Sequence, residues 1–235
     1  MSKQLQKMSE IGLVPLVVLE DAACAKPLGE ALVAGGIPVA EVTFRTDACL
    51  DIIRAMKEIP TLIVGAGTVH TVKQAEAAVA AGATFIVTPA YNPDVIDWCT
   101  AHKVDIVPGT VSPGEIEAVR ARGIKFCKFF PAAAYGGTAT LKALAGPFAD
   151  VQFLPTGGVS LDNMRDYLSL PNVAAVGGSF MTPGKLVKEQ DWDGIAAVCR
   201  GAVQKMLGLR IGHVGIHTAS RAEAEELTDA LCRLT

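Results

Sequence analysis

The chain has 235 residues, of which half are hydrophobic and 19% are charged, and its formal net charge is −3. This length and composition are typical of a globular protein with one large α/β domain. Positive and negative side chains are interspersed without a basic stripe, which argues against nucleic acid or an anionic membrane surface as a partner. We therefore expect the partner to be a small molecule.

The N-terminal residues 1–10 are polar, and no apolar run of the length of a signal peptide or a spanning helix follows them. The six cysteines are scattered without a C-x-x-C pair, which is typical of reduced thiols in a cytoplasm. The four histidines form no cluster with acidic residues, so the ligands of a metal site are missing. We expect a cytoplasmic protein that needs neither a metal nor another cofactor.

Short β-branched runs alternate with Ala-rich helical stretches along the chain. Strands are predicted over residues 13–19, 39–44, 62–64, 84–87, 104–107, 124–129, 151–154 and 173–176. Helices are predicted between them, over residues 22–34, 48–57, 72–81, 93–101, 113–121 and 161–168. Eight strand–helix units predict a parallel sheet and favour a closed (β/α)8 TIM barrel, with an open doubly wound sheet as the alternative.

Residues 208–235 extend beyond this barrel of residues 1–207. Residues 211–217 alternate like a strand, and Ser220 with Glu223 forms a capping box before a helix that ends near Leu234. This βα pair resembles the start of a vicinal-oxygen-chelate (glyoxalase-like) module, whose remainder is absent. Two histidines, His213 and His217, are too few for a metal site. We expect a packing or oligomer-contact role for the extension.

The second predicted strand carries three polar residues at a spacing of two. Glu41, Thr43 and Arg45 then share one face, while apolar residues occupy the other. Burying a carboxylate and a guanidinium inside a barrel is costly unless they serve each other or a ligand. The pattern therefore indicates either a ligand site or a structural ion pair between Glu41 and Arg45.

Lys128 stands at the carboxyl end of the sixth predicted strand, on the same face as Ile124 and Phe126. An ammonium group there loses hydration, which favours the neutral, nucleophilic amine that Schiff-base formation with a ketone requires. Lys125 starts the strand and faces the other way, as expected of a solvated lysine. The alternative for Lys128 is a lysine merely paired with a carboxylate.

Glycine pairs follow the last two predicted strands, as Gly157-Gly158 and as Gly177-Gly178 before Ser179. In barrels of this kind, the loops after strands seven and eight often bind phosphate through backbone amides, although tight turns also use glycine. Thr68 lies in a loop of small residues after the third strand, where its N–H and O–H groups can reach a carboxylate.

Five motifs in this order make the chain resemble the 2-dehydro-3-deoxy-6-phosphogluconate (KDPG) and 4-hydroxy-2-oxoglutarate (KHG) aldolase family over about residues 8–207. They are Glu41-Val42-Thr43-Phe44-Arg45-Thr46, Gly65-Ala66-Gly67-Thr68-Val69, Lys128-Phe129-Phe130-Pro131-Ala132, Pro155-Thr156-Gly157-Gly158 and Gly177-Gly178-Ser179. Members of this family are class I aldolases that need no metal and are usually homotrimers. Their substrates are 2-keto acid sugar phosphates.

The resemblance implies a role for each matching residue. Lys128 would be the Schiff-base lysine and Glu41 the general acid/base, while Arg45 and Thr68 would hold the pyruvate carboxylate. The phosphate would bind at Gly157, Gly158, Gly178 and Ser179, and the residues next to the substrate would be Thr43, Thr156, Pro89 and Phe130.

Two departures from the family pattern affect the substrate rather than the lysine chemistry. The fourth strand ends Thr88-Pro89-Ala90, where serine, proline and glycine are common, and Ala133 stands where a glutamate is common. The sugar's stereochemistry, gluconate against galactonate, and the use of unphosphorylated 4-hydroxy-2-oxoglutarate therefore stay open. A sugar-phosphate isomerase and a non-catalytic sugar-acid-binding barrel are the rival functions, and Lys128 argues against both.

Overall fold

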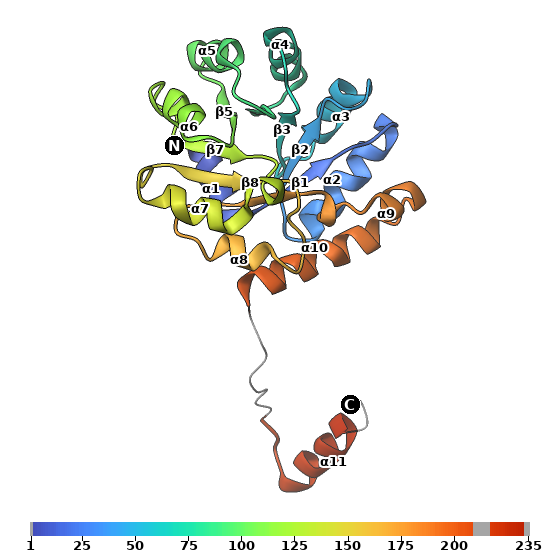
Figure 1. Cartoon of the computed structure of the whole chain (residues 1–235). Coiled ribbons are helices and arrows are strands. Elements are labelled where there is room, and N and C mark those ends of the chain that lie inside the picture. The colour runs from blue at the N-terminus through green and yellow to red at the C-terminus, as the bar shows by residue number, and fades with distance from the viewer. Residues whose placement is uncertain (1, 209–216, 233–235) are drawn as a thin grey trace.

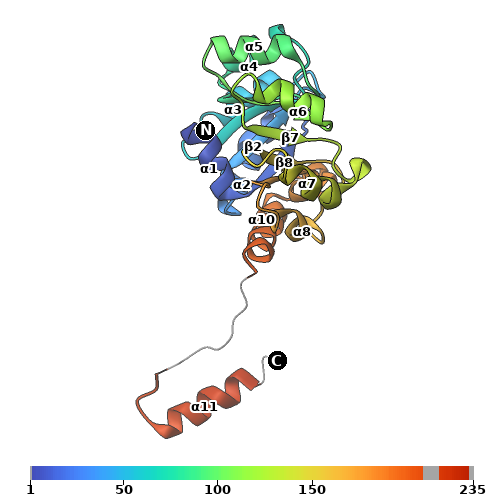
Figure 2. The same ribbon diagram turned by 60° about the vertical axis from the view of Figure 1, so that its left-hand side comes forward.

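The computed structural model describes residues 2–208 and 217–232, and Figures 1 and 2 show strands at the centre with helices around them. Every strand pair is parallel, with the order β5-β4-β3-β2-β1-β9 in one sheet and β6-β7-β8 in a second. The strands are β1 (Leu13–Val17), β2 (Val39–Thr43), β3 (Ile63–Gly67), β4 (Phe85–Val87), β5 (Asp105–Val107), β6 (Gly109–Thr110), β7 (Phe126–Phe129), β8 (Gln152–Pro155) and β9 (Val176–Gly178). The chain thus has an α/β fold with a curled parallel sheet.

The predicted fifth strand, over residues 104–107, corresponds to β5, and a further short strand, β6, follows it after Pro108. Proline has no N–H group to donate to a ladder, so it interrupts a strand in the middle of a sheet. Its carbonyl still accepts a hydrogen bond from the N–H of Lys128 at 2.8 Å. Pro108 therefore lies between the last strand of the first sheet, β5, and the first strand of the second sheet, β6. The bond from Lys128 keeps β7 beside Pro108.

Two strands lie further along the chain than predicted. The third strand runs through Gly65 and Gly67 instead of ending before them, and the eighth begins at Val176 and includes the Gly177-Gly178 pair. Glycine has a low strand propensity, which is why both segments read as loops. Here the missing side chains make room for close neighbours, since a Cβ at Gly65 would lie 2.3 Å from the ring of Phe85.

The helices that cover the sheet are α1 (Lys3–Ile11), α2 (Ala25–Ala34), α3 (Cys49–Met56), α4 (Val72–Ala81), α5 (Pro93–Ala101), α6 (Pro113–Arg120), α7 (Gly137–Ala145), α8 (Met164–Leu168), α9 (Gly184–Glu189) and α10 (Trp192–Leu207). Proline and glycine set several of their ends, since Pro93 opens α5, Pro113 opens α6, and Gly82 caps α4 with φ of 112°. The sixth predicted helix begins only at Met164, because residues 160–163 form a turn instead.

Helix α1 was not predicted, because its sequence is mostly polar. Leu5 and Met8, three residues apart, are its buried residues, and the Ser2 side chain accepts a hydrogen bond from the N–H of Leu5 at 3.2 Å. Ser2 also donates to Asp105 at the start of β5, and the Ser9 hydroxyl lies 3.4 Å from the carbonyl of Ala174, before β9. The helix thus covers the amino ends of the strands, away from their carboxyl ends.

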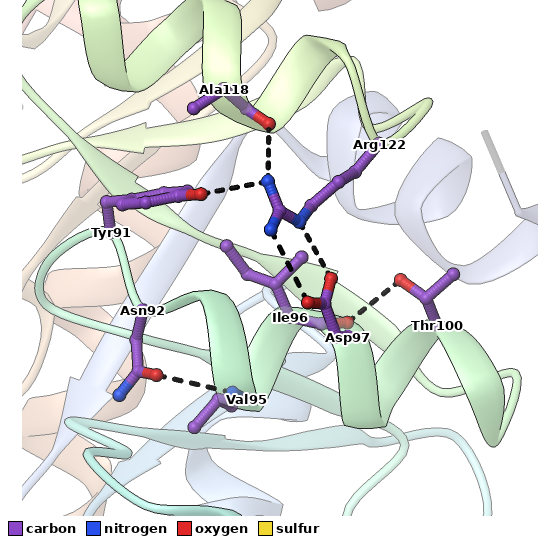
Figure 3. A network of polar contacts seen from close by, with 8 residues as sticks. All are labelled: Tyr91, Asn92, Val95, Ile96, Asp97, Thr100, Ala118 and Arg122. Carbon is purple, nitrogen blue, oxygen red and sulfur yellow. Dashed lines mark hydrogen bonds and ion pairs between the residues drawn. The ribbon is translucent and has the colours of Figure 1, made fainter.

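A network of polar contacts ties α5 to the end of α6 (Figure 3). Arg122 lies just beyond α6, and its Nε donates to Oδ1 of Asp97 at 2.7 Å while Nη1 donates to the Tyr91 hydroxyl at 2.8 Å. Nη1 also reaches the carbonyl of Ala118 at 3.1 Å. One guanidinium therefore joins the loop before α5, α5 itself and α6.

In the C-terminal extension, the structure describes α11 (Arg221–Cys232). The Ser220 hydroxyl accepts the N–H of Glu223 at 3.3 Å, which confirms half of the predicted capping box; the Glu223 carboxylate accepts the N–H of Ala219 instead. The strand predicted over residues 211–217 lies outside the described residues except for its last position. Within the described residues, no helix combines the length and apolar character needed to span a membrane.

Candidate active site

Two buried charged residues face each other at the centre of the fold. Nζ of Lys128, on β7, lies 3.0 Å from Oε1 of Glu41, on β2, and their side chains are 5% and 0% exposed. A charge buried this deeply is tolerated only when it is paired. The sequence left open an ion pair between Glu41 and Arg45, but the partner of Glu41 is Lys128.

Both backbone polar groups of Lys128 form hydrogen bonds with the segment that runs from β5 to β6. Its N–H donates to the carbonyl of Pro108 at 2.8 Å, and its carbonyl accepts a hydrogen bond from the Thr110 hydroxyl at 3.2 Å. Nζ lies 5.3 Å from the centroid of the Phe130 ring, a cation–π distance. Fixed backbone and an aromatic neighbour restrict where the amine can point.

Two buried oxygen atoms at this place lack a hydrogen-bond partner among the described residues. They are Oε2 of Glu41 and Oγ1 of Thr156, at the carboxyl end of β8. Buried polar atoms in proteins are almost always hydrogen-bonded, so an unpaired oxygen indicates a position where a ligand or water binds. The Lys128–Glu41 pair therefore has one unpaired carboxylate oxygen, and the Thr156 hydroxyl is a second unpaired group. Both are available to form hydrogen bonds with a ligand.

Arg45 does not continue the strand face of Glu41 and Thr43, as the sequence pattern had indicated. Strand β2 ends at Thr43, and the Arg45 N–H donates to the Thr43 carbonyl at 2.8 Å, which turns the chain. The Arg45 side chain is exposed and forms no ion pair with the described residues. The Thr43 hydroxyl is bound to the carbonyl of Val17 at 3.2 Å and so has a structural partner.

Thr68 stands directly after β3 with φ of 57°. A β-branched residue rarely adopts this left-handed conformation, which costs about 1–3 kcal/mol where it occurs and is enriched at functional sites. The Thr43–Gly67 register of β2 and β3 places Thr68 at the same end of the sheet as Arg45. This location fits the carboxylate-binding role that the sequence resemblance implies for the two residues.

A cavity of about 210 Å³ lies at this end of the sheet. It is lined by Leu16, Val18, Arg45, Phe130, Thr156, Gly157, Gly158, Val159, Gly178 and Ser179. Seven of these are residues singled out from the sequence. The apolar residues Leu16, Val18 and Val159 were missed, and the first two could have been found because they lie at the carboxyl end of the first strand.

The glycine loop offers donors to an anion. Gly157 and Gly158 have φ of 89° and 79°, and no backbone acceptor among the described residues is found for the N–H groups of Gly158 and Ser179. Free backbone amides can bind a phosphate without a lysine. The only cationic side chain among the described lining residues is that of Arg45.

Two of the residues implied to be substrate-proximal do not line this cavity. Thr43 is bound within the sheet, and Pro89 follows β4 and packs on the backbone of Gly109, where an added Cβ would lie 2.4 Å from the Pro89 carbonyl carbon. Thr68, Lys128 and Glu41 are likewise absent from the lining, and Phe130, whose ring centroid lies 5.3 Å from Nζ of Lys128, connects the buried pair to the cavity. The cavity thus brings together Phe130, Thr156, Arg45 and the residues that the resemblance implies for phosphate binding.

A larger cavity, of about 390 Å³, lies at the opposite end of the strands. Its charged lining residues are already paired: Ser2 donates to Asp105, and Lys125 lies 3.2 Å from Asp150. Lys125 is exposed, as predicted from its place in the strand. No lining residue of this cavity carries an unpaired buried side-chain polar atom, whereas Thr156 in the smaller cavity does, so the smaller cavity is the candidate site.

A buried strand lysine against a carboxylate, next to a cavity lined with free amides, is the arrangement expected of a lysine-dependent aldolase on an α/β fold. The comparison with known families agrees. The model for the family "KDPG and KHG aldolase" matches residues 5–198, and the chain belongs to this family.

Individual relatives cover nearly the same part of the chain. A 2-dehydro-3-deoxy-phosphogluconate aldolase of Haemophilus influenzae is 41% identical over 200 residues, which are 85% of this chain and 94% of the relative. A KHG/KDPG aldolase of Escherichia coli is 42% identical over 193 residues, which are 82% and 91% of the two chains. The crystal structure of KDPG aldolase from Legionella pneumophila, with pyruvate captured as a covalent carbinolamine intermediate, matches with a TM-score of 0.79 at 39% identity, over 81% of this chain and 93% of that one.

Proposed function

We propose that this protein is a class I aldolase that cleaves 2-dehydro-3-deoxy-6-phosphogluconate to pyruvate and glyceraldehyde 3-phosphate. The observation that carries the proposal is the buried contact of 3.0 Å between Lys128 and Glu41, close to a cavity of about 210 Å³ whose lining includes Arg45 and the glycine loop. Cleavage of 4-hydroxy-2-oxoglutarate to pyruvate and glyoxylate is a second reaction of the same site, in line with the KHG/KDPG aldolase of Escherichia coli.

In the proposed reaction, the neutral amine of Lys128 adds to the C2 keto carbon of the substrate. Loss of water from the carbinolamine gives a protonated imine, which draws electrons out of the C3–C4 bond. Removal of the C4 hydroxyl proton breaks that bond, and glyceraldehyde 3-phosphate leaves with the new carbonyl. The enamine that remains takes a proton at C3, and hydrolysis releases pyruvate and restores the amine.

We assign the proton transfers to Glu41. Its Oε1 contacts the amine at 3.0 Å, so it can accept a proton from Lys128, while its unpaired Oε2 is free to accept one from the substrate or a water. The buried Thr156 hydroxyl, also unpaired, is a further group for the substrate hydroxyls. A single carboxylate can thus serve imine formation and bond cleavage in turn.

We assign the two ends of the substrate to two groups of donors. Arg45 and Thr68 hold the carboxylate, because a guanidinium can bind it through two hydrogen bonds and thereby fix the ketone toward the lysine. The amides of Gly158 and Ser179, with Gly157 and Gly178 beside them in the cavity lining, hold the phosphate. The Phe130 ring lies 5.3 Å from the amine, and we assign Thr43 and Pro89 to supporting the strand ends around it.

Several broader expectations belong to the same proposal. We propose that the two sheets form a closed (β/α)8 barrel, which the parallel bridges Phe153–Val173 and Thr156–Gly177 support by linking β8 to the region of β9. We also propose a division into a barrel of residues 1–207 and an extension of residues 208–235, a homotrimeric assembly and a cytoplasmic location. The last is supported by the free thiols, such as those of Cys99 and Cys127.

Three alternatives compete with this function. The departures at Ala90 and Ala133 leave 2-dehydro-3-deoxy-6-phosphogalactonate as an alternative substrate of the same lysine chemistry. A sugar-phosphate isomerase would use the phosphate site but would not require a lysine buried against a glutamate. A non-catalytic sugar-acid-binding barrel would require neither unpaired oxygen, and the Lys128–Glu41 contact argues against it.

The test is mass spectrometry after incubation with pyruvate and borohydride, because reduction traps an imine as a stable secondary amine. The wild type should gain a pyruvate-derived adduct, Lys128→Met should gain none, and Lys125→Met, the exposed lysine of the same segment, should behave as the wild type. Absence of an adduct on the wild type would overturn the aldolase proposal and favour the isomerase or binding alternatives. Cleavage assays with the gluconate and galactonate substrates then decide the stereochemistry.

A further inference from the structure

We propose that Gly67 is a positioning residue whose missing side chain provides the space in which the Glu41 carboxylate reaches Lys128. The inference rests on the proposed function for its catalytic consequence, but its structural part can be tested without any activity. Gly67 is the last residue of β3 and lies on the strand next to β2, which carries Glu41.

The geometry leaves no room for a side chain at this position. A Cβ added to Gly67 would lie 2.2 Å from Oε1, 2.6 Å from Cγ and 2.8 Å from Cδ of Glu41. All three distances are well inside van der Waals contact, which for carbon begins at about 3.5 Å. Oε1 is also the atom that contacts Nζ of Lys128, so the clash falls on the catalytic oxygen itself.

The backbone does not explain the glycine. Gly67 is not among the residues with positive φ, so an alanine could adopt its extended conformation without strain. The nearby Gly65 differs, because a Cβ there would meet the ring of Phe85, a core residue. Gly65 therefore serves packing, whereas the three closest atoms to a Cβ at Gly67 all belong to Glu41.

A substitution at Gly67 should act through Glu41. To reach ordinary contact, the carboxylate must move by roughly 1 Å away from β3, and a misplacement of that size in a catalytic group costs about 100-fold in rate. The backbone of Lys128 is hydrogen-bonded to Pro108 and Thr110, not to β3, so the added Cβ acts on the carboxylate and does not displace the lysine backbone. The expected result of Gly67→Ala is a folded enzyme with a broken Lys–Glu contact.

The first experiment measures melting temperature in a cycle of Gly67→Ala, Glu41→Ala and the double variant. Gly67→Ala should lower the melting temperature when Glu41 is present and have little effect in the Glu41→Ala background, because that substitution removes all three clashing atoms. Gly114→Ala, in α6 where a Cβ has open space among the described residues, is the control. An equal loss in both backgrounds would overturn the proposal, and the cycle remains informative even if the single variant folds poorly.

The second experiment measures kcat for Gly67→Ala, Glu41→Gln and their combination. If Gly67 acts by seating the carboxylate, the double variant should be no more than a few-fold slower than the slower single variant. Multiplication of the two losses would overturn the proposal, because it would mean that Gly67 acts elsewhere. Failure of the aldolase proposal itself would be recognised separately, by the absence of a borohydride-trapped adduct on the wild type.

Discussion

Nζ of Lys128 and Oε1 of Glu41 lie 3.0 Å apart, although 87 positions separate the two residues in the chain. The contact joins β7 of one sheet to β2 of the other and is buried. It brings a nucleophile and a proton acceptor together, which is the geometric requirement for an amine that must lose a proton before it attacks a ketone. The predictions below follow from this pair and its surroundings.

Glu41→Gln should lower kcat by about 100- to 1,000-fold, because the amide keeps the shape and a hydrogen-bond acceptor for Lys128 but cannot take up a proton. The trapped pyruvate adduct should still form, more slowly than in the wild type. Steady-state cleavage assays and the rate of adduct formation measure the two effects. A variant with normal kcat would show that another group transfers the proton.

Arg45→Ala should raise KM for the keto acid more than about 10-fold, because the exposed guanidinium makes no ion pair with the described residues and is free for a carboxylate. The melting temperature should change by no more than a few degrees. Arg54→Ala, which breaks an exposed contact with Asp51 on α3, is the control for loss of a surface arginine. A parallel fall of activity and melting temperature would indicate a structural role instead.

Gly158→Ala should weaken binding of the phosphorylated substrate and leave pyruvate adduct formation largely intact. Its φ of 79° costs a residue with a side chain about 1–2 kcal/mol, and the new Cβ would lie 2.3 Å from that of Ala133, which must shift the loop. Gly123→Ala is a matched control, with φ of 78° and open space among the described residues. The comparison of KM for the phosphorylated substrate and for 4-hydroxy-2-oxoglutarate measures the effect. Equal changes for both substrates would place the phosphate elsewhere.

The Arg122–Asp97 pair predicts a pH dependence of stability (Figure 3). The hydrogen bond from Arg122 holds the pKa of the Asp97 carboxyl below its ordinary value, against the smaller opposing effect of desolvation. A lowered folded-state pKa stabilises the protein above the unfolded-state pKa, about 4, and this contribution is lost as the pH falls through the folded-state pKa.

Asp97→Asn should therefore lower the melting temperature at pH 7 by no more than a few degrees, because the pair is exposed. The difference from the wild type should shrink as the pH falls from about 5 toward the lowered pKa. Thermal unfolding of both proteins across this range measures it. A difference that stays constant with pH would mean that the pair contributes through packing rather than charge.

Much of the site could be predicted from the sequence because its signals are local. The sequence predicts that Lys125 is exposed and Lys128 buried, and the structure confirms both, although β7 begins only at Phe126, after Lys125. The order of the strand–helix units and most helix ends also follow from periodicity and from glycine and proline, which act within a few residues. Both glycine pairs were found for the same reason, although Gly177-Gly178 lies within β9 and not after it.

The remaining features depend on contacts between segments distant in sequence, and these only the tertiary structure decided. Alternation alone placed Arg45 on the strand face of Glu41, whereas the sheet ends at Thr43 and leaves Glu41 to pair with a lysine from β7. The glycines of β3 read as a loop because glycine has little strand propensity, but Gly67 lies in a strand where the Glu41 carboxylate fills the space of its missing side chain. Local pattern specifies which residues are extended, helical or buried; packing in three dimensions determines which buried charges meet.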